Sequence, residues 1–78
     1  MKLTYDPRHN IAYIRLQEKK IEVETIRISD ELNVDVAPDG TVYGIELLNA
    51  NAQLFQENQG KLVIINEAAR EKQEINLI

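Results

Sequence analysis

The chain has 78 residues, nine basic and thirteen acidic side chains, a formal net charge of −4 and no cysteine. A chain of this length predicts one domain over residues 1–78 with a core that is marginal by itself, and the missing cysteines exclude disulfides and thiolate metal ligands. Because Lys19-Lys20 is the longest basic run and the overall charge is acidic, the composition argues against a nucleic-acid partner.

Two strands joined by a turn are predicted at the amino terminus. Residues 2–5 alternate in polarity and residues 6–10 form a cluster of turn-forming residues around Pro7. The following strand, residues 10–16, is apolar at both parities, with Ile11 and Tyr13 on one side and Ala12, Ile14 and Leu16 on the other. This pattern is typical of a strand that is covered on both faces.

A third strand is predicted within residues 21–29, after a charged connection at residues 17–20. Ile21 and Val23 share one phase of the alternation, whereas Ile26 and Ile28 share the other. Either a bulge near residues 24–25 or a strand that begins only at Thr25 would reconcile the two phases.

Residues 32–48 predict the main β-hairpin, around which the rest of the chain is organised. Pro38 and Asp39 suit the central positions of a type I turn, and Gly40 can adopt the left-handed conformation that closes the loop. With residues 37–40 as the loop, the predicted register pairs Val34 with Tyr43 and alternates the side chains between two faces. One face then carries Leu32, Val34, Val36, Tyr43, Ile45 and Leu47, and the other carries Asn33, Asp35, Val42, Gly44 and Glu46.

The chain after the hairpin predicts one short helix and a strand. Asn49 suits an N-cap, residues 50–55 suit one to two helical turns, and Phe55 is expected to pack on the sheet. Gly60 ends this segment and residues 61–66 form an aliphatic strand. Residues 67–78 are open to two interpretations, a helix around residues 68–72 or a second hairpin that pairs residues 62–66 with 73–77, and the alternation favours the hairpin.

These elements predict an α+β, mostly β fold: an antiparallel β-meander of about five strands with one short helix after the main hairpin and a C-terminal hairpin. The longest aliphatic run, residues 62–65, is too short to cross a bilayer, and residues 1–10 lack the apolar region of a signal peptide. We therefore expect a cytoplasmic protein without a membrane partner.

Three stretches resemble one bacterial family. They are KLTYDPRHNIAYIRL at residues 2–16, NVDV at residues 33–36, and DG at 39–40 with GIELLNA at 44–50. Together they are similar to domain of unknown function 2283, with residues 1–56 as the shared core and residues 57–78 as an extension. The resemblance implies a small β-rich protein without established catalytic residues. It also implies a role as an antitoxin-like inhibitor, because some members are paired with a small toxin-like protein.

Few residues suggest a catalytic or metal site. His9 is the only histidine, so it is interpreted as a solvated turn residue, and Ser29 has no base near it in sequence. Asp35 and Glu46 point to one face in the predicted register, and such a pair can perform acid–base chemistry or hold a divalent cation. A solvated acidic face is the commoner arrangement, so we expect neither an enzyme nor a bound cofactor or metal.

The apolar pattern indicates an interaction surface instead. Tyr5, Tyr13 and Tyr43 are expected on one face, in a core or interface. One short helix cannot cover the apolar side chains on both faces of the sheet, so the predicted interface comprises Ile14, Leu16, Val42 and Leu48. The sequence thus predicts a homo-oligomeric interaction module, with a small basic partner protein as the second hypothesis and a carboxylate- or metal-dependent enzyme as the third.

Overall fold

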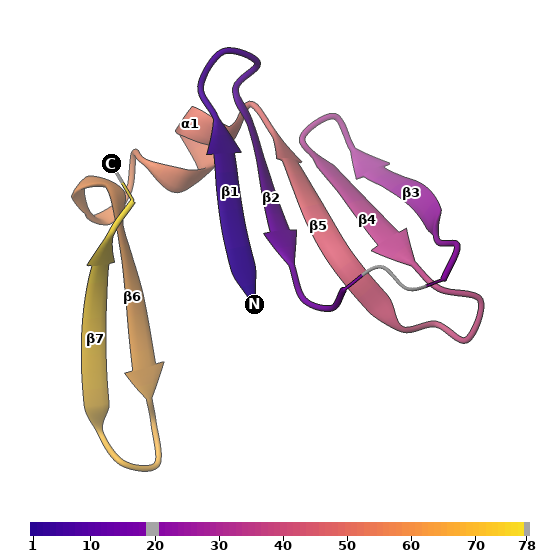
Figure 1. Cartoon of the computed structure of the whole chain (residues 1–78). Coiled ribbons are helices and arrows are strands. Elements are labelled where there is room, and N and C mark those ends of the chain that lie inside the picture. Colours follow the sequence, from indigo (N-terminus) through magenta and orange to yellow (C-terminus); the bar gives the residue numbers. More distant parts are fainter. Residues whose placement is uncertain (19–20, 78) are drawn as a thin grey trace.

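The computed structural model describes residues 1–18 and 21–77, and it confirms the predicted α+β, mostly β class (Figure 1). Five strands form an antiparallel sheet in the order β1-β2-β5-β4-β3, and two further strands form a separate hairpin. The elements are β1 (Lys2–Asp6), β2 (Ile11–Arg15), β3 (Glu24–Ser29), β4 (Leu32–Val36), β5 (Val42–Leu48), α1 (Ala50–Leu54), the 3-10 turn η1 (Asn58–Gly60), β6 (Lys61–Asn66) and β7 (Glu71–Asn76). Residues 19 and 20 of the predicted connection 17–20, and residue 78 at the end of the segment 67–78, lie outside the described residues.

The β1–β2 turn is held by its first residue. The Asp6 carboxylate accepts hydrogen bonds from the backbone N–H of Arg8 at 2.9 Å and of His9 at 3.4 Å. Asn10 closes the turn with φ 56°, a left-handed conformation that asparagine adopts more readily than most residues. The turn cluster of the sequence is therefore confirmed as a tight connection between two paired strands.

Strand β3 begins at Glu24, after the first residues of the predicted segment 21–29. This agrees with the alternative of a strand that starts late, near Thr25. The predicted bulge near residues 24–25 is wrong, because the irregularity in the pairing with β4 lies between Arg27 and Ser29. Ile28, between them, is the extra residue, and its side chain is exposed.

The main hairpin forms as predicted, but its register differs by two residues. The turn is closed by the N–H of Gly40 donating to the carbonyl of Ala37 at 2.9 Å. Beyond the turn, Val34 pairs with Ile45 rather than with Tyr43, because a bulge places both Val42 and Tyr43 opposite Val36. The Tyr43 carbonyl accepts hydrogen bonds from the N–H groups of Leu16 and Gln17 on the other side, at 2.9 and 3.2 Å, which holds this bulge in place.

Helix α1 follows β5 as predicted, but its amino terminus is capped by another part of the chain. Asn49 is at the N-cap position with φ 54° and makes no capping hydrogen bond, so the predicted Asn49 cap is wrong. The side-chain oxygen of Asn10 accepts the N–H of Asn51 at 2.8 Å, and the Asn10 carbonyl accepts the N–H of Ala50 at 3.0 Å. Phe55 then packs edge-on against Tyr5 of β1 with ring centroids 5.0 Å apart, which confirms its predicted contact with the sheet.

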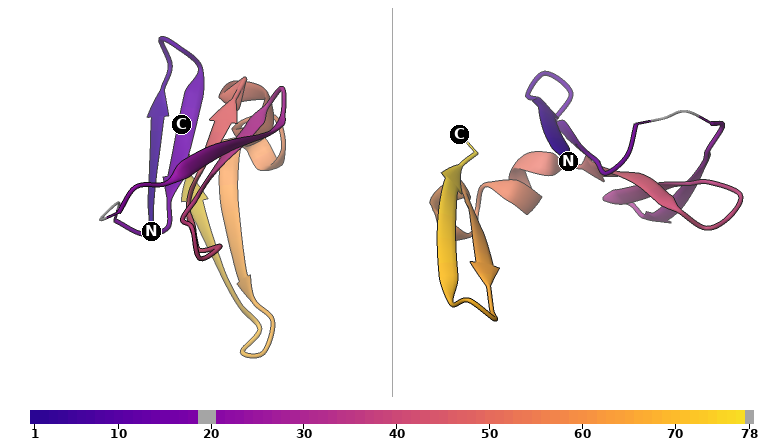
Figure 2. Two further views of the ribbon diagram at one scale, coloured as in Figure 1. Left: turned by 90° about the vertical axis from the view of Figure 1, so that its right-hand side faces the viewer. Right: turned by 60° about the horizontal axis from the view of Figure 1, so that its bottom comes forward.

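The carboxyl-terminal segment forms the hairpin that the alternation favours. Strand β7 begins at Glu71, two residues before the predicted strand, and Leu62 pairs with Ile75. The alternative helix around residues 68–72 is wrong, because residues 67–70 form the turn and Arg70 closes it with φ 56°. Figures 1 and 2 show this hairpin standing away from the five-stranded sheet.

The described residues contain almost no enclosed core. Their only buried apolar side chains are three alanines, Ala12, Ala37 and Ala50. The accessible surface is 6103 Å², whereas a compact monomer of 9.0 kDa exposes about 4,900 Å². The radius of gyration is 14.1 Å, against about 11.5 Å for a compact chain of this length. The excess surface of roughly 1,200 Å² is unusual for a monomer of this size.

None of the helical segments in residues 1–18 and 21–77 is long and apolar enough to cross a bilayer.

Candidate interaction surface

A row of aliphatic side chains crosses the whole sheet. The pairing register sets these residues side by side on neighbouring strands, one from each strand: Leu3, Ile14, Ile45, Val34 and Ile26. We call them the aliphatic row. With four inter-strand spacings, the row is about 19 Å long. Leu3 and Ile26, at its two ends, are 36% and 41% exposed.

A second row on the same side continues the apolar surface. It contains Tyr5, Ala12, Leu47 and Leu32 and ends at Ser29. Together the two rows form what we call the apolar face. Phe55, through its contact with Tyr5, covers one corner of this face next to α1. No charged side chain belongs to either row.

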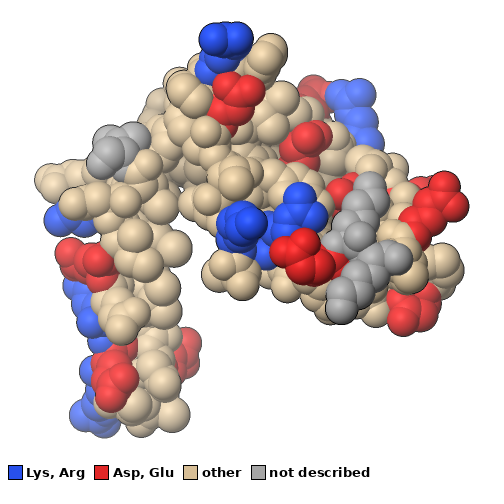
Figure 3. All heavy atoms as spheres, viewed as in Figure 1, with Lys and Arg blue, Asp and Glu red and all other residues tan. Residues whose placement is uncertain are grey.

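The opposite side of the sheet is polar, because side chains alternate along each strand. The adjacent row there consists of Thr4, Tyr13, Glu46, Asn33 and Arg27. Figure 3 shows basic and acidic side chains interspersed over the sheet in the view of Figure 1, with acidic ones gathered toward β3. The expectation that the three tyrosines share one face is therefore wrong, since Tyr13 lies opposite Thr4 on the polar side and Tyr5 opposite Ala12 on the apolar side.

Tyr13 ties three strands together on the polar side. Its ring lies over Gly44 of β5, where an added Cβ would be only 2.0 Å from the Tyr13 hydroxyl oxygen. The hydroxyl then donates to the Asp35 carboxylate of β4 at 2.6 Å. Burial first, and then this hydrogen bond, raise the pKa of Tyr13 to about 12. The close approach of this ring requires a residue without a Cβ at position 44.

The predicted acidic pair, Asp35 and Glu46, lies on this polar side, where both carboxylates accept hydrogen bonds from neighbouring strands. Asp35 accepts from Tyr13 and also from the Thr25 hydroxyl at 2.6 Å, while Glu46 accepts from the Asn33 amide at 2.9 Å. The described residues hold no group of three or more histidine, aspartate or glutamate side chains arranged for a metal ion. The two carboxylates are thus engaged by neighbouring strands.

The predicted interface residues divide between the two sides. Ile14 is in the aliphatic row, and Val42 pairs with Val36 on the apolar side, because the bulge at Tyr43 reverses its alternation. The placement of Val42 opposite the main apolar face is therefore wrong. Leu48 pairs with Ile11 on the polar side, and Leu16 follows the end of β2 with 41% of its surface exposed.

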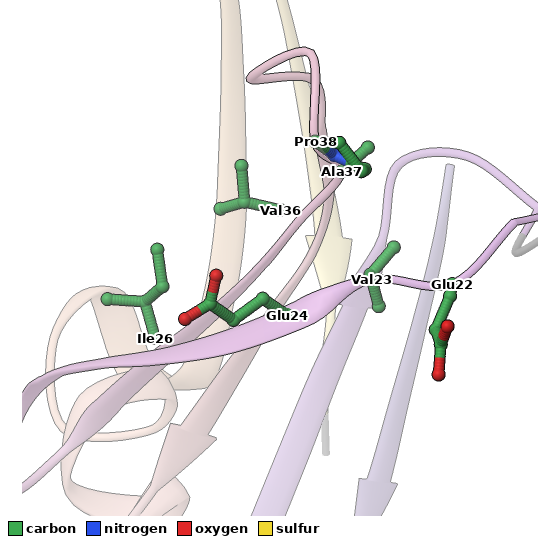
Figure 4. A pocket seen from close by; sticks show the side chains of 7 residues that line it. All are labelled: Glu22, Val23, Glu24, Ile26, Val36, Ala37 and Pro38. Atoms are coloured by element: carbon green, nitrogen blue, oxygen red, sulfur yellow. The ribbon is translucent and has the colours of Figure 1, made fainter.

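A groove extends the apolar face at the β3 end of the sheet (Figure 4). Its volume is about 510 Å³, and its lining residues are Glu22, Val23, Glu24, Ile26, Val36, Ala37 and Pro38. In Figure 4, Glu24 and Ile26 project from the same side of β3. Of the predicted Pro38-Asp39-Gly40 turn, Pro38 belongs to this lining.

An amide cluster that the sequence did not indicate joins three connections at one end of the sheet. Asn10 donates to the side-chain oxygens of Asn51 at 2.7 Å and Asn49 at 3.3 Å, and Asn49 donates to the Glu31 carboxylate at 2.9 Å. The Gln53 amide donates to the carbonyl of Glu31 at 3.0 Å. The partners are up to 41 residues apart in sequence, so no local pattern signals the cluster.

The remaining candidates are turn residues. His9 Nδ1 lies 2.8 Å from the Asp6 carboxylate in an exposed turn, and this hydrogen bond holds the pKa of Asp6 below its usual value. The Ser29 hydroxyl accepts the N–H of Glu31 at 3.1 Å in the β3–β4 turn. The structure brings neither of them next to the Asp35 network.

Comparison with known proteins identifies one family. The family model described as a protein of unknown function, DUF2283, matches residues 2–51, which span β1 to the start of α1 and contain the whole apolar face of the sheet. No curated protein and no solved structure matches the chain.

Proposed function

Because the chain belongs to the DUF2283 family, whose function is unknown, we propose from its surfaces that it is a non-catalytic protein-interaction module of the cytoplasm, acting as a homodimer. In this dimer the apolar face of each copy is covered by the other copy. Face-to-face packing of sheets at a separation of about 10 Å interdigitates side chains from both layers into one core.

The aliphatic row supports this role most directly. Five aliphatic side chains in line across five strands form a continuous apolar surface, while the described residues enclose only three alanines. Large contiguous apolar surfaces on soluble proteins mark interaction sites. A standard interface buries about 800 Å² on each partner, and the excess surface is larger than this area.

A matched pair of variants on β1 tests the dimer. Leu3→Lys places a charge at the end of the aliphatic row, whereas Thr4→Lys places the same charge on the polar side of the same strand. Light scattering at tens of micromolar should give twice the 9.0 kDa of one chain for the unmodified protein and for Thr4→Lys. The Leu3→Lys dimer should dissociate into single chains. The Ile45→Lys substitution, at the centre of the row, should leave an even smaller fraction of dimer. A monomeric unmodified protein at this concentration would contradict the dimer.

The groove favours a second candidate function, the inhibition of a small basic partner protein. Glu22 and Glu24 accompany an apolar lining there, and β3 is an edge strand whose outer side is unpaired in the sheet order. An edge strand can add an extended segment of another protein through backbone hydrogen bonds. The product of an adjacent reading frame should then co-purify with this protein, and Glu24→Lys should abolish the co-purification. Recovery that is unaffected by Glu24→Lys would exclude the groove as the binding site.

A further inference from the structure

We propose that the β6–β7 hairpin is a dimerisation arm, which packs its apolar side against the apolar face of a second copy of this chain. This inference rests on the proposed homodimer. It concerns a segment outside the family match, which ends at residue 51, and it names what that segment binds.

One side of the hairpin carries three aliphatic side chains together with the polar side chains of Asn66, Glu71 and Gln73. Leu62 pairs with Ile75 and Ile64 pairs with Gln73, so Leu62, Ile64 and Ile75 share a side, and they are 38%, 42% and 45% exposed. The other side carries Val63 and Ile65 among Lys61, Lys72 and Glu74, which form ion pairs at 3.6 and 3.2 Å. An isolated two-stranded hairpin is at best marginally stable in water. The hairpin therefore gains most if Leu62, Ile64 and Ile75 are covered, because their side carries one charged residue and the other side carries three.

The arm leaves the sheet on the side of the apolar face. Phe55 packs on Tyr5, which belongs to that face, and β6 begins at Lys61. In the left view of Figure 2, α1 and the hairpin lie on the same side of β1 and β2. The intervening turn is tied by Gly60 N–H to the Glu57 carbonyl at 3.1 Å and by Leu77 N–H to the Gly60 carbonyl at 3.0 Å. These bonds order the base of the hairpin.

The dimensions of the arm match those of the aliphatic row. Each strand of the hairpin has six residues and is therefore about 20 Å long, which is close to the length of a row that crosses five strands. In a two-fold dimer the same contact occurs twice, because each copy contributes one arm and one face. A second copy thus covers two surfaces that one copy leaves open.

The absence of cysteine from the chain allows a direct test with single-cysteine variants. An Ile64→Cys chain is mixed with an Ile26→Cys chain and treated with a flexible bismaleimide. The expected product is a covalent heterodimer, in a yield about tenfold above that from Ile65→Cys, which points to the other side of the hairpin. As a second measurement, Ile64→Lys should raise the dimer dissociation constant about tenfold or more, and Ile65→Lys should not.

The outcomes separate this inference from the proposed dimer. If the protein is dimeric but Ile64→Cys cross-links no better than Ile65→Cys, the arm is wrong and the dimer stands. If a doubly substituted Ile64→Cys/Ile26→Cys chain cross-links within itself while diluted among unmodified chains, the arm closes on its own sheet and the inference is overturned. A monomeric protein overturns both. Circular dichroism checks that each variant is folded.

Discussion

Tyr13 is the side chain on which the polar side of the sheet depends. It extends from β2 across Gly44 of β5 to Asp35 of β4, and the Arg15 guanidinium lies 5.4 Å from the centre of its ring. A glycine in the central strand leaves room for a neighbouring aromatic ring. The ring supplies the packing that the glycine lacks. Tyr13 and Gly44 thus act as one structural unit.

Removing the Tyr13 hydroxyl should therefore destabilise the fold. Tyr13→Phe keeps the ring over Gly44 but takes a hydrogen-bond donor away from the Asp35 carboxylate, and we expect the free energy of unfolding to fall by about 1–2 kcal/mol. Tyr5→Phe is the matched control, because the contact of Tyr5 with Phe55 is between rings. Equal urea midpoints for the two variants would contradict the role of the hydroxyl.

The same residue should make stability depend on pH in the alkaline range. The folded protein raises the pKa of Tyr13 from 10.0 to about 12, so the folded state holds this proton after the unfolded chain has released it. The resulting stabilisation is complete below pH 10 and is lost as pH rises toward 12. Tyr13→Phe should lack this loss, and absorbance titration of tyrosinate should lack its component near pH 12. An unchanged titration would contradict the raised pKa.

At the scale of elements, α1 depends on a residue of the β1–β2 turn. Five residues are too few for an independently stable helix. Asn10, at the β1–β2 turn, accepts the N–H of Asn51, and its carbonyl accepts that of Ala50. The first turn of the helix is therefore attached to the sheet by a polar anchor, while Phe55 provides the apolar one.

Loss of the Asn10 side chain should release this helix. We expect Asn10→Gly, which keeps the left-handed conformation of this residue accessible, to lower the free energy of unfolding by about 1–2 kcal/mol through loss of its side-chain hydrogen bonds, and to weaken the nuclear Overhauser contacts between Tyr5 and Phe55. Asn49→Gly is the control, since glycine keeps the left-handed conformation accessible. A larger effect of Asn49→Gly than of Asn10→Gly would contradict the role of Asn10 as the anchor of α1.

The β6–β7 turn carries strain that the β1–β2 turn avoids. Both four-residue turns end in a left-handed residue, Asn10 in one and Arg70 in the other, with φ 56° in each. Left-handed φ costs an ordinary residue roughly 1–2 kcal/mol, and asparagine less. Arg70→Asn should therefore stabilise the hairpin by about 0.5–1 kcal/mol, measured as slower amide exchange in β6 and β7. Arg70→Lys should leave exchange unchanged, and equal exchange in both variants would refute the strain.

At the scale of the whole molecule, residues 1–18 and 21–77 of one chain enclose almost no core. The buried alanines contribute little apolar area, and the larger aliphatic side chains form an open layer. Burial of apolar surface is the dominant favourable term in folding. The stability of the protein should therefore be linked to association of its chains.

This linkage predicts that melting depends on concentration. A tenfold increase in protein should raise the melting temperature by about 3–5 °C if unfolding and dissociation occur together. Thr4→Lys should keep this dependence, and Leu3→Lys should lose it, because only Leu3 belongs to the aliphatic row. Scanning calorimetry measures both. A melting temperature independent of concentration would mean that one chain is stable by itself.

The family assignment, the mostly β class, the Pro38-Asp39-Gly40 turn and the two faces of β4 could all be obtained from the sequence. Side chains alternate with a period of two, so the composition of each face follows from local order, and even a register error of two residues leaves those faces unchanged. The error itself came from the bulge at Tyr43, which depends on hydrogen bonds from Leu16 and Gln17 of another strand. The same bulge explains the misplaced Val42.

Local order thus determined which side chains share a face, because neighbours along a strand point in opposite directions whatever the strand pairs with. Only the tertiary structure decided that five of them align in a row across the sheet, that Tyr13 occupies the space above Gly44, and that Asn10 caps a helix forty residues away in the chain. Each of these contacts joins segments whose proximity depends on the order and register of the strands, and no short stretch of sequence encodes that order.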